Sequence, residues 1–298
     1  MYRRSVRHFS FLAVAALVAC TTTRSNTAGD HSDHDSSSPA PSASVSPSTS
    51  LPPDAMSARA RLSASPRHAE WVMISAGADS VRAYIVYPER KTKAPVVVVV
   101  HEIFGISPWI RGVVDQLAAD GFIAIAPDLL TSKNLPNPTD SVPSDLATAA
   151  IRTLNQDDVH RQISAAANYA MNLPSAVRKY GIVGYCWGGG VAFAHAVRSA
   201  SLGASVVYYG TSPDSGALPS VKAPVLGLYG GNDARVNATI PRADSILKKL
   251  GKAYEPHIYE GAGHGFLRQQ SGQNGANLTA TQQAWPATIA WFRRYLGA

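Results

Sequence analysis

The sequence predicts an α/β protein in which a mostly parallel central sheet is covered by helices on both faces. The five consecutive valines at 96–100 suit a strand that is buried on both faces. Further short apolar runs alternate along the chain with segments of helical apolar spacing. This alternation is typical of parallel strands joined by crossover helices.

Each expected element follows from its apolar pattern and from the glycines, prolines and aspartates that bound it. The strands are expected at 71–75, 81–87, 96–100, 122–126, 181–185, 204–209, 224–229 and 256–259. The helices are expected at 109–119, 157–171, 188–197, 241–250 and 281–295. Residues 131–150 carry several Pro, Ser, Thr and Asp residues and are expected to form a long surface excursion.

The N-terminus has the features of an export signal. Three arginines within the first seven residues precede an apolar stretch at 9–18 that is too short to span a membrane. The stretch ends in Leu17-Val18-Ala19-Cys20, which resembles the lipobox of bacterial lipoproteins. That resemblance implies removal of residues 1–19, lipidation of Cys20 and a location in the cell envelope, with acyl chains holding the protein on a membrane. An ordinary cleaved signal with an incidental cysteine is the alternative.

Composition separates a tether from one folded domain. Residues 20–66 are rich in Ser, Thr, Pro, Asp and Ala and are expected to form a flexible tether. Residues 67–298 are sufficient for a single large α/β domain, which we expect to be monomeric. The formal net charge is +7, but no basic run with interleaved aromatic residues occurs in the domain, which argues against nucleic-acid binding.

A candidate nucleophile lies between the strand expected at 181–185 and the helix expected at 188–197. Gly184-Tyr185-Cys186-Trp187-Gly188 has the form G-x-C-x-G, the nucleophile elbow of α/β-hydrolases with Cys in place of Ser. Free backbone N–H groups at the start of a helix favour an anion and lower the pKa of a thiol. The frame of glycines favours a catalytic role for Cys186 over that of a buried structural thiol.

The acid and the base of such a triad follow the nucleophile in the chain. Asp233 comes in a Gly-Gly-Asn-Asp loop just after the strand expected at 224–229, and His264 lies between two glycines after the strand expected at 256–259. Either residue could be only a loop residue, but the positions favour catalysis. Asp233 would orient the imidazole and His264 would transfer the proton.

The turn after the valine strand is His101-Glu102-Ile103-Phe104-Gly105. Hydrolases of this fold place an oxyanion-hole amide in this turn. His101 is expected to border the site. Glu102 could be a solvated loop carboxylate, or it could face the cysteine.

These motifs together resemble the dienelactone hydrolase family over about residues 70–298. The resemblance implies a Cys–His–Asp triad, no metal or organic cofactor, and a Glu102 that contacts the resting thiol and helps to generate the thiolate. It also implies that the amides of Ile103 and Trp187 form the oxyanion hole and that Arg268 binds a substrate carboxylate. The second carboxylate-binding arginine of the family has no clear counterpart in residues 131–160, where Arg152 is one candidate.

The expected function is hydrolysis of a carboxylic ester or enol lactone through an acyl-cysteine. A broad-specificity carboxylesterase would share the triad without requiring Arg268. A non-catalytic envelope binding lipoprotein would retain the fold alone. The intact set of Cys186, Asp233, His264 and Glu102 argues against a binding protein.

Overall fold

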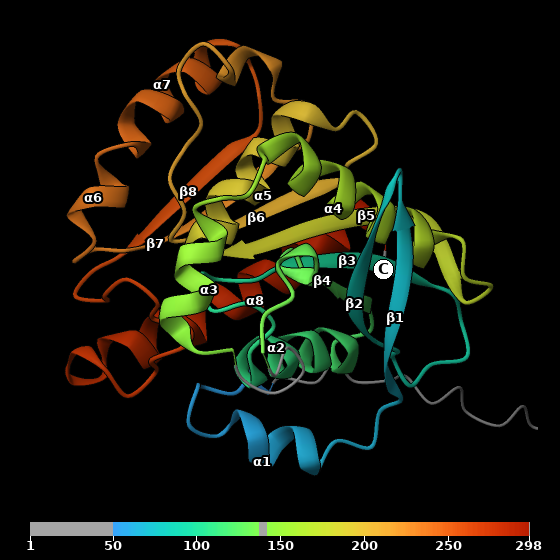
Figure 1. Ribbon diagram of the computed structural model, residues 1–298. Helices are drawn as coiled ribbons and strands as arrows, with labels where there is room; N and C mark the ends of the chain where they lie inside the picture. The colour runs from blue at the N-terminus through green and yellow to red at the C-terminus, as the bar shows by residue number, and fades with distance from the viewer. Residues whose placement is uncertain (1–49, 137–141, 298) are drawn as a thin grey trace, which may run out of the picture. The chain divides into compact units, whose positions relative to one another are not determined.

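The computed structural model describes residues 50–136 and 142–297. These residues form an eight-stranded sheet with the order β1-β2-β4-β3-β5-β6-β7-β8 (Figure 1). The six strands from β3 to β8 are parallel, whereas β2 is antiparallel to both β1 and β4. The predicted α/β fold with a mostly parallel sheet is therefore confirmed.

The elements of the described residues have the following bounds. The strands are β1 Ala69–Ala76, β2 Asp79–Val86, β3 Ala94–Val100, β4 Ile123–Pro127, β5 Ala176–Tyr185, β6 Ala204–Tyr208, β7 Val225–Gly230 and β8 Tyr254–Tyr259. The α-helices are α1 Ala58–Ser63, α2 Pro108–Ala119, α3 Ser144–Ile151, α4 Gln156–Met171, α5 Trp187–Arg198, α6 Ala234–Asn237, α7 Ile240–Lys249 and α8 Ala276–Leu296. Short 3-10 helices are η1 Thr131–Lys133, η2 Leu218–Ser220 and η3 Gln273–Gly275.

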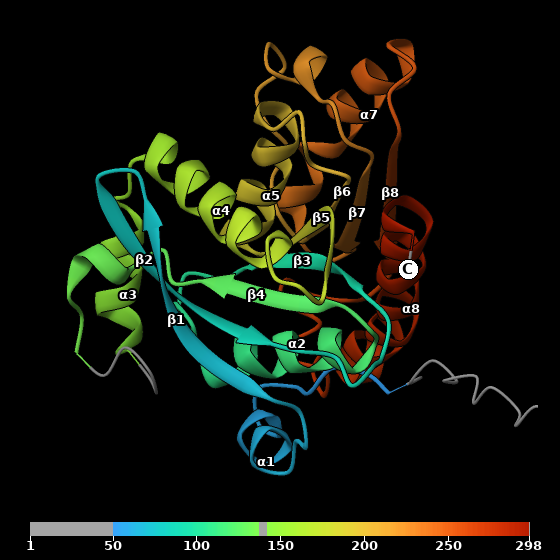
Figure 2. The same ribbon diagram turned by 90° about the vertical axis from the view of Figure 1, so that its right-hand side faces the viewer.

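The valines of β3 connect two hydrophobic cores, one on each face of the sheet. Val96, Val98 and Val100 pack into a core with α4, α5 and α7. Val97 and Val99 point to the other face and pack into a core with α2 and α8. This alternation follows from the two-residue period of a strand. Figure 2 shows α4 and α5 on one side of the sheet and α2 on the other.

All eight expected strands and all five expected helices are present, with shifted boundaries. The largest shift in a strand is in β5, which begins at Ala176 because its first residues pair with the start of β3. The surface excursion expected at 131–150 contains η1 and most of α3. Residues 137–141 of this excursion lie outside the described residues.

The tether was expected to extend to residue 66, and this boundary is wrong. Residues 50–66 are folded and include α1, and both Pro52 and Pro53 are buried. The indole Nε1 of Trp109 in α2 donates a 3.0 Å hydrogen bond to the carbonyl of Pro53. Packing against α2 thus orders a segment whose composition alone favours disorder, and the described fold includes residues from 50 onward. The expected signal at 1–19 and the rest of the tether to residue 49 lie outside the described residues.

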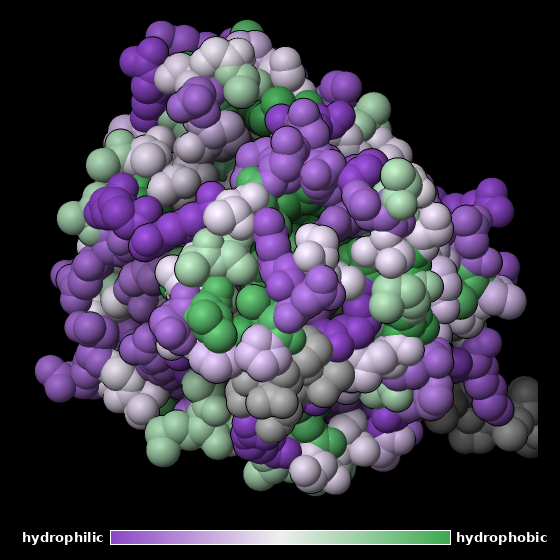
Figure 3. Space-filling model, in the orientation of Figure 1, coloured by the Kyte–Doolittle hydropathy of each residue, from purple (hydrophilic) through white to green (hydrophobic). Residues whose placement is uncertain are grey.

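The surface of the described chain is mixed in polarity. On the face shown in Figure 3, hydrophilic and hydrophobic side chains are mixed. Among the helices of residues 50–136 and 142–297, none combines the length and the apolar character that a membrane crossing requires.

Candidate active site

Cys186 occupies a strained position between β5 and α5. Its φ of 56° and ψ of −118° put a residue with a side chain in the region that favours glycine. A Cβ atom at Gly184 would overlap the carbonyl of Gly188, and one at Gly188 would overlap the carbonyls of Val100 and His101. The glycines of the motif therefore permit the sharp turn that presents the thiol at the start of α5.

Cys186, His264 and Asp233 form one continuous chain of contacts. His264 Nε2 lies 3.1 Å from Cys186 Sγ, and His264 Nδ1 lies 2.5 Å from Asp233 Oδ2. Asp233 is buried, whereas His264 is half-buried. The carboxylate accepts the Nδ1 proton, so Nε2 is free to accept the proton of the thiol.

Backbone contacts fix the loops that carry the acid and the base. The N–H of Asn232 donates to the carbonyl of Ala262 at 2.9 Å, which joins the loop after β7 to the loop after β8. The N–H of Gly263 donates to the buried Asn277 side chain of α8, also at 2.9 Å. These bonds fix the backbone around His264, which lies between Asp233 and Cys186.

Opposing influences act on the thiol of Cys186. Burial raises its pKa, and the nearby charge of Glu102 raises it further. The N–H of Trp187 and the positive charge of Arg235 lower the pKa of Cys186. The resting thiol is therefore protonated at neutral pH, and thiolate formation requires a neighbouring base, which His264 is placed to be.

Glu102 is buried directly after β3 and pairs with Arg268. The Arg268 Nε atom lies 3.0 Å from Glu102 Oε2, close enough for an ion pair but not aligned for a hydrogen bond. Burial raises the pKa of Glu102 to about 7, although the charge of Arg268 opposes the rise. Among the described residues the thiol contacts His264 and the carboxylate of Glu102 pairs with Arg268, while the charge of Glu102 still acts on the thiol.

His101 supports the turn that carries Glu102 and Ile103. Its Nδ1–H donates to the carbonyl of Glu102 at 2.6 Å, and its Nε2 accepts from the N–H of Leu129 at 3.3 Å. Complete burial lowers the pKa of His101, which keeps the ring neutral in this arrangement. His101 thus borders the site, as expected, and acts on the backbone of the turn.

The two amides expected to form an oxyanion hole flank the thiol. Ile103 and Trp187 both line the pocket that contains Cys186. Within the described part of the chain, the N–H of Ile103 has no protein acceptor, and the N–H of Trp187 interacts with the thiol. An amide without a protein acceptor is available to a substrate oxygen.

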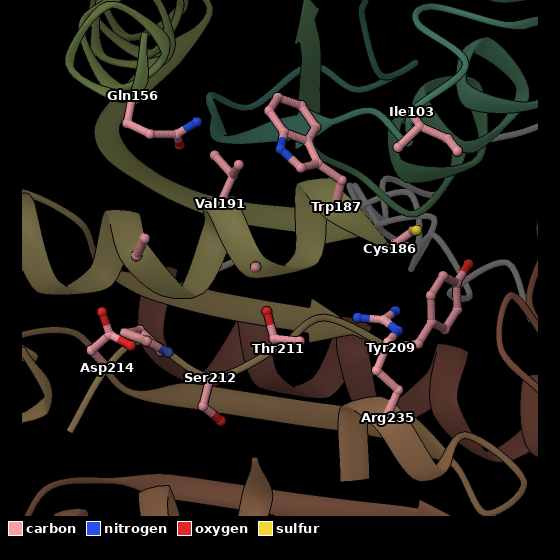
Figure 4. Close-up of a pocket in the computed structure, with 13 residues that line it drawn as sticks. Ile103, Gln156, Cys186, Trp187, Val191, Tyr209, Thr211, Ser212, Asp214 and Arg235 are labelled. Carbon is pink, nitrogen blue, oxygen red and sulfur yellow. The ribbon is translucent and has the colours of Figure 1, made fainter. Parts of the chain in front are cut away.

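The pocket beside Cys186 has a volume of about 570 Å³ and extends along α5 (Figure 4). Gly190, Val191 and Ala194 of α5 form one wall, and residues 211–214 after β6 form the opposite wall. Gln156 of α4 closes the far end. A pocket of this size accommodates an organic substrate larger than a few atoms.

Tyr209 and Arg235 line this pocket close to the thiol and were not among the sequence candidates. Tyr209 follows β6 with a φ of 40°, and its ring centroid lies 5.1 Å from that of His264. Arg235 follows Asp233 by two residues and lines the same pocket. Ligands bind at the carboxyl ends of parallel strands. Tyr209 and Arg235 come just after β6 and β7, so this rule could have identified both as candidate site residues.

The remaining sequence candidates lie elsewhere. Arg268 lines a separate cavity of about 290 Å³ with Phe104, and its guanidinium lies 5.0 Å from the centre of the Phe104 ring. Arg152 is exposed at the end of α3 and does not line the pocket beside the thiol. Cys20 lies outside the described residues.

Comparisons with known proteins show the family of this chain. Residues 81–296 match the dienelactone hydrolase family. A Pseudomonas putida protein named carboxymethylenebutenolidase is 33% identical over 198 residues, which cover 64% of this chain and 82% of that protein. A Salmonella typhimurium protein, named as a candidate carboxymethylenebutenolidase, is 30% identical over 231 residues and covers 74% and 84% of the two chains.

A solved structure gives the same result at the level of the fold. The crystal structure of a candidate dienelactone hydrolase from Klebsiella pneumoniae superposes with a TM-score of 0.68 at 27% identity. The superposition covers 77% of this chain and 99% of that one.

Proposed function

The chain belongs to the dienelactone hydrolase family, and from this premise we propose that it hydrolyses a carboxylic ester or enol lactone through an acyl-cysteine. The main support is the chain of contacts from Cys186 Sγ through His264 to Asp233, at 3.1 Å and 2.5 Å. These are the distances that proton transfer between a nucleophile, a base and an orienting acid requires.

In the first half of the proposed reaction, His264 takes the proton of Cys186 and the sulfur bonds to the carbonyl carbon. The carbonyl oxygen becomes an oxyanion, which the amides of Ile103 and Trp187 would stabilise by about 3 kcal/mol per donor. The tetrahedral intermediate collapses, the bond to the alkoxide or enolate breaks, and His264 passes its proton to the leaving group, which leaves Nε2 free to act as a base again. The acyl group remains on sulfur as a thioester.

In the second half, His264 removes a proton from water, and the resulting hydroxide attacks the thioester carbon. The carbon–sulfur bond breaks, the carboxylic acid leaves, and His264 returns the proton to sulfur, which restores the resting thiol. Asp233 stabilises the imidazolium in both halves. Glu102 is a further proposed member of the catalytic set, because its raised pKa of about 7 lets it exchange a proton near neutral pH.

The experiment is a hydrolysis screen over enol lactones and aryl esters with the wild type and Cys186→Ala. We expect turnover by the wild type and a loss of several orders of magnitude in the variant, since the removal of other triad nucleophiles has that effect. The free energy of unfolding should change little, because the substitution removes only one sulfur atom. A folded Cys186→Ala protein with most of the wild-type activity would exclude the covalent mechanism.

A broad-specificity carboxylesterase is the second candidate. It is favoured by the position of Arg268 outside the pocket beside Cys186. The screen separates the two, because a carboxylesterase would accept simple neutral aryl esters at least as well as lactones. A non-catalytic binding lipoprotein would give no turnover with any of them.

We also propose that the chain is exported and held in the cell envelope by a lipid on Cys20, and that the domain is a monomer. The support for the anchor is the lipobox-like sequence that ends at Cys20. Cys20→Ala should abolish acylation and move the protein from the membrane fraction to the soluble fraction. A variant that remains acylated and membrane-bound would contradict the anchor.

A further inference from the structure

The pocket beside Cys186 is lined by polar side chains that have no partner in the protein. Within residues 50–136 and 142–297, several polar groups of the lining form no hydrogen bond or ion pair with another residue. They include the side chains of Gln156, Thr211, Asp214 and Arg235 and the indole N–H of Trp187. Hydrogen-bond donors and acceptors are both present in this set, so the pocket offers both to a ligand.

The wall formed by residues 211–214 is fixed by the chain behind it. The N–H of Ser212 donates to Thr239 Oγ1 at 3.1 Å, and the Thr239 hydroxyl lies 3.5 Å from the Ser212 hydroxyl. Figure 4 shows the Ser212 hydroxyl turned away from α5, whereas the Thr211 hydroxyl points toward it. A Cβ atom at Gly190 would lie 3.4 Å from Thr211 Oγ1, so the glycine leaves room for a ligand beside that hydroxyl.

The opposite wall is formed by the start of α4 and the start of α5. Gln156 is the first residue of α4, and the preceding Asn155 fixes this end of the helix by accepting the N–H of Asp157 at 2.8 Å. Figure 4 shows the Gln156 amide and the Trp187 indole on the side of α5 opposite to Thr211. The floor between the walls consists of glycine and short side chains of α5. Polar groups therefore face each other across an open floor.

The position of His264 decides which part of a substrate enters this pocket. His264 Nε2 contacts the thiol, but His264 is not part of the pocket lining. In the proposed reaction the leaving group takes its proton from His264, so it must lie on the His264 side of the sulfur. The pocket along α5 is then left for the acyl portion.

From this arrangement we propose that the pocket binds an acyl group that carries several hydroxyl groups, as in an ester or lactone of a sugar acid. Each hydroxyl both donates and accepts, so neighbouring hydroxyls can satisfy a wall that presents donors and acceptors together. An apolar acyl group would cover the same polar groups without giving them partners, which is unfavourable. This inference rests on the proposed function, because it names the substrate class of the same site.

The kinetic test compares two neutral 4-nitrophenyl esters with the same ether ring in the acyl group. One is the ester of methyl glucopyranosiduronic acid, which has hydroxyls on its ring carbons, and the other is the ester of tetrahydropyran-2-carboxylic acid, which has none. The preference is the ratio of their kcat/KM values, divided by the ratio of their rates of alkaline hydrolysis. The wild type should prefer the hydroxylated ester by at least about tenfold, because a site built to bind hydroxyls rejects an analogue without them.

Thr211→Val and Gln156→Met keep the approximate shape of each side chain and remove its hydrogen-bonding group. Each should lower the preference by about three- to tenfold, the scale of one lost neutral hydrogen bond. Thr211→Ser retains the hydroxyl and should retain most of the preference. The matched control is Gln283→Met, an exposed glutamine on α8, which packs on the other face of the sheet. A ratio is insensitive to misfolded protein, which lowers both rates equally.

A second readout does not depend on turnover. Iodoacetamide alkylates Cys186, with the sulfur bonding to carbon as iodide leaves, and a compound bound in the pocket should slow this reaction. The probes are the amides of the same two acids. The hydroxylated amide should halve the labelling rate at a concentration at least about tenfold below that of the other amide, and Thr211→Val should remove most of this difference.

Equal preference for the two esters in the wild type, or an unchanged preference in both Thr211→Val and Gln156→Met, would overturn the inference. The proposed function fails separately, because it is excluded if Cys186→Ala still hydrolyses both esters. In that case the protection of Cys186 by the two amides still decides whether this pocket binds hydroxylated groups.

Discussion

Glu102 and Arg268 show how a single residue depends on its partner inside the site. Glu102 is buried, with a pKa raised to about 7, and the positive charge of Arg268 favours its ionised form. Loss of that charge raises the pKa of the carboxyl further and leaves it protonated at neutral pH. Arg268 lies outside the pocket, but through this pair it influences the protonation of the Glu102 carboxyl near Cys186.

If Glu102 helps to form the thiolate, Arg268→Ala should shift the acid limb of the pH–rate profile upward by about 1 pH unit, measured with a neutral ester. The sign follows because a higher pKa delays the appearance of the basic carboxylate as pH rises. The matched control is the same substitution in a Glu102→Gln background, where no carboxylate remains to titrate. An equal effect of Arg268→Ala in both backgrounds would show that the two residues are not coupled.

The residue types of the candidate site could be predicted from the sequence, but not every contact between their side chains. Cys186, Asp233 and His264 could be predicted because each occupies a fixed position in a motif or after a strand. The partner of Arg268 could not, since its neighbour Glu102 lies more than one hundred and sixty residues away and nothing local joins them. Arg235 was overlooked although its place after β7 was a signal, because an exposed arginine after an acid loop has no distinctive pattern of its own.

At the scale of elements, the segment before β1 is ordered by what it contacts. Besides the bond from Trp109, the Gln270 side chain donates to the carbonyl of Pro52 at 3.0 Å. The N–H of Ala55 donates to the carbonyl of Arg268 at 2.9 Å. The segment thus joins α2 to the loop after β8 that carries His264. Its composition of Pro, Ser and Ala has no apolar period, so sequence alone could not predict this docking.

The substitution Gly112→Ala tests whether the segment before β1 packs on α2, because its effect on the free energy of unfolding should have opposite signs in two chains. A Cβ at this position in α2 would lie 2.5 Å from the ring of Pro53, so the substitution should reduce the free energy of unfolding of the full chain. In a chain that begins at residue 67, the same substitution should increase the free energy of unfolding by up to about 1 kcal/mol, because alanine has a higher helix propensity than glycine. Stabilisation in both chains, measured by urea unfolding, would mean that the segment does not pack on α2.

A histidine pair joins α4 to α5, the helix that begins next to Cys186. His160 Nδ1 and His195 Nδ1 lie 3.1 Å apart with stacked rings, and the Tyr180 hydroxyl lies 3.0 Å from His195 Nε2. Burial lowers the pKa of His160 to about 4 and that of His195 to about 3. Both rings are therefore neutral in the folded protein at neutral pH.

Acidification should destabilise the fold through this pair. Between about pH 6.5 and pH 4, the unfolded chain binds protons on these histidines and the folded chain does not, so stability is full above pH 6.5 and falls below it. From pH 7 to pH 5 the loss should be about 2 kcal/mol for each histidine. The free energy of unfolding of His195→Gln should depend less steeply on pH than that of the wild type. Parallel curves for the two proteins would rule out this contribution.

At the scale of the whole molecule, the parallel sheet brings distant parts of the chain to one edge. Cys186 follows β5, Asp233 follows β7 and His264 follows β8, so the carboxyl ends of three strands carry the proposed triad. This convergence is a property of parallel strands and could be predicted once the alternation of elements was recognised. The shape of the pocket could not, because it depends on how α5 and residues 211–214 face each other across it.

The central claim is that the reaction passes through a thioester on Cys186. The most direct measurement is an acid quench during turnover of an activated aryl ester, followed by peptide mass mapping of the wild type and Cys186→Ala. We expect a mass increase equal to the acyl group on the peptide that contains Cys186, removable by hydroxylamine and absent in the variant. Steady hydrolysis with no acyl adduct, or with an adduct on another residue, would contradict the mechanism.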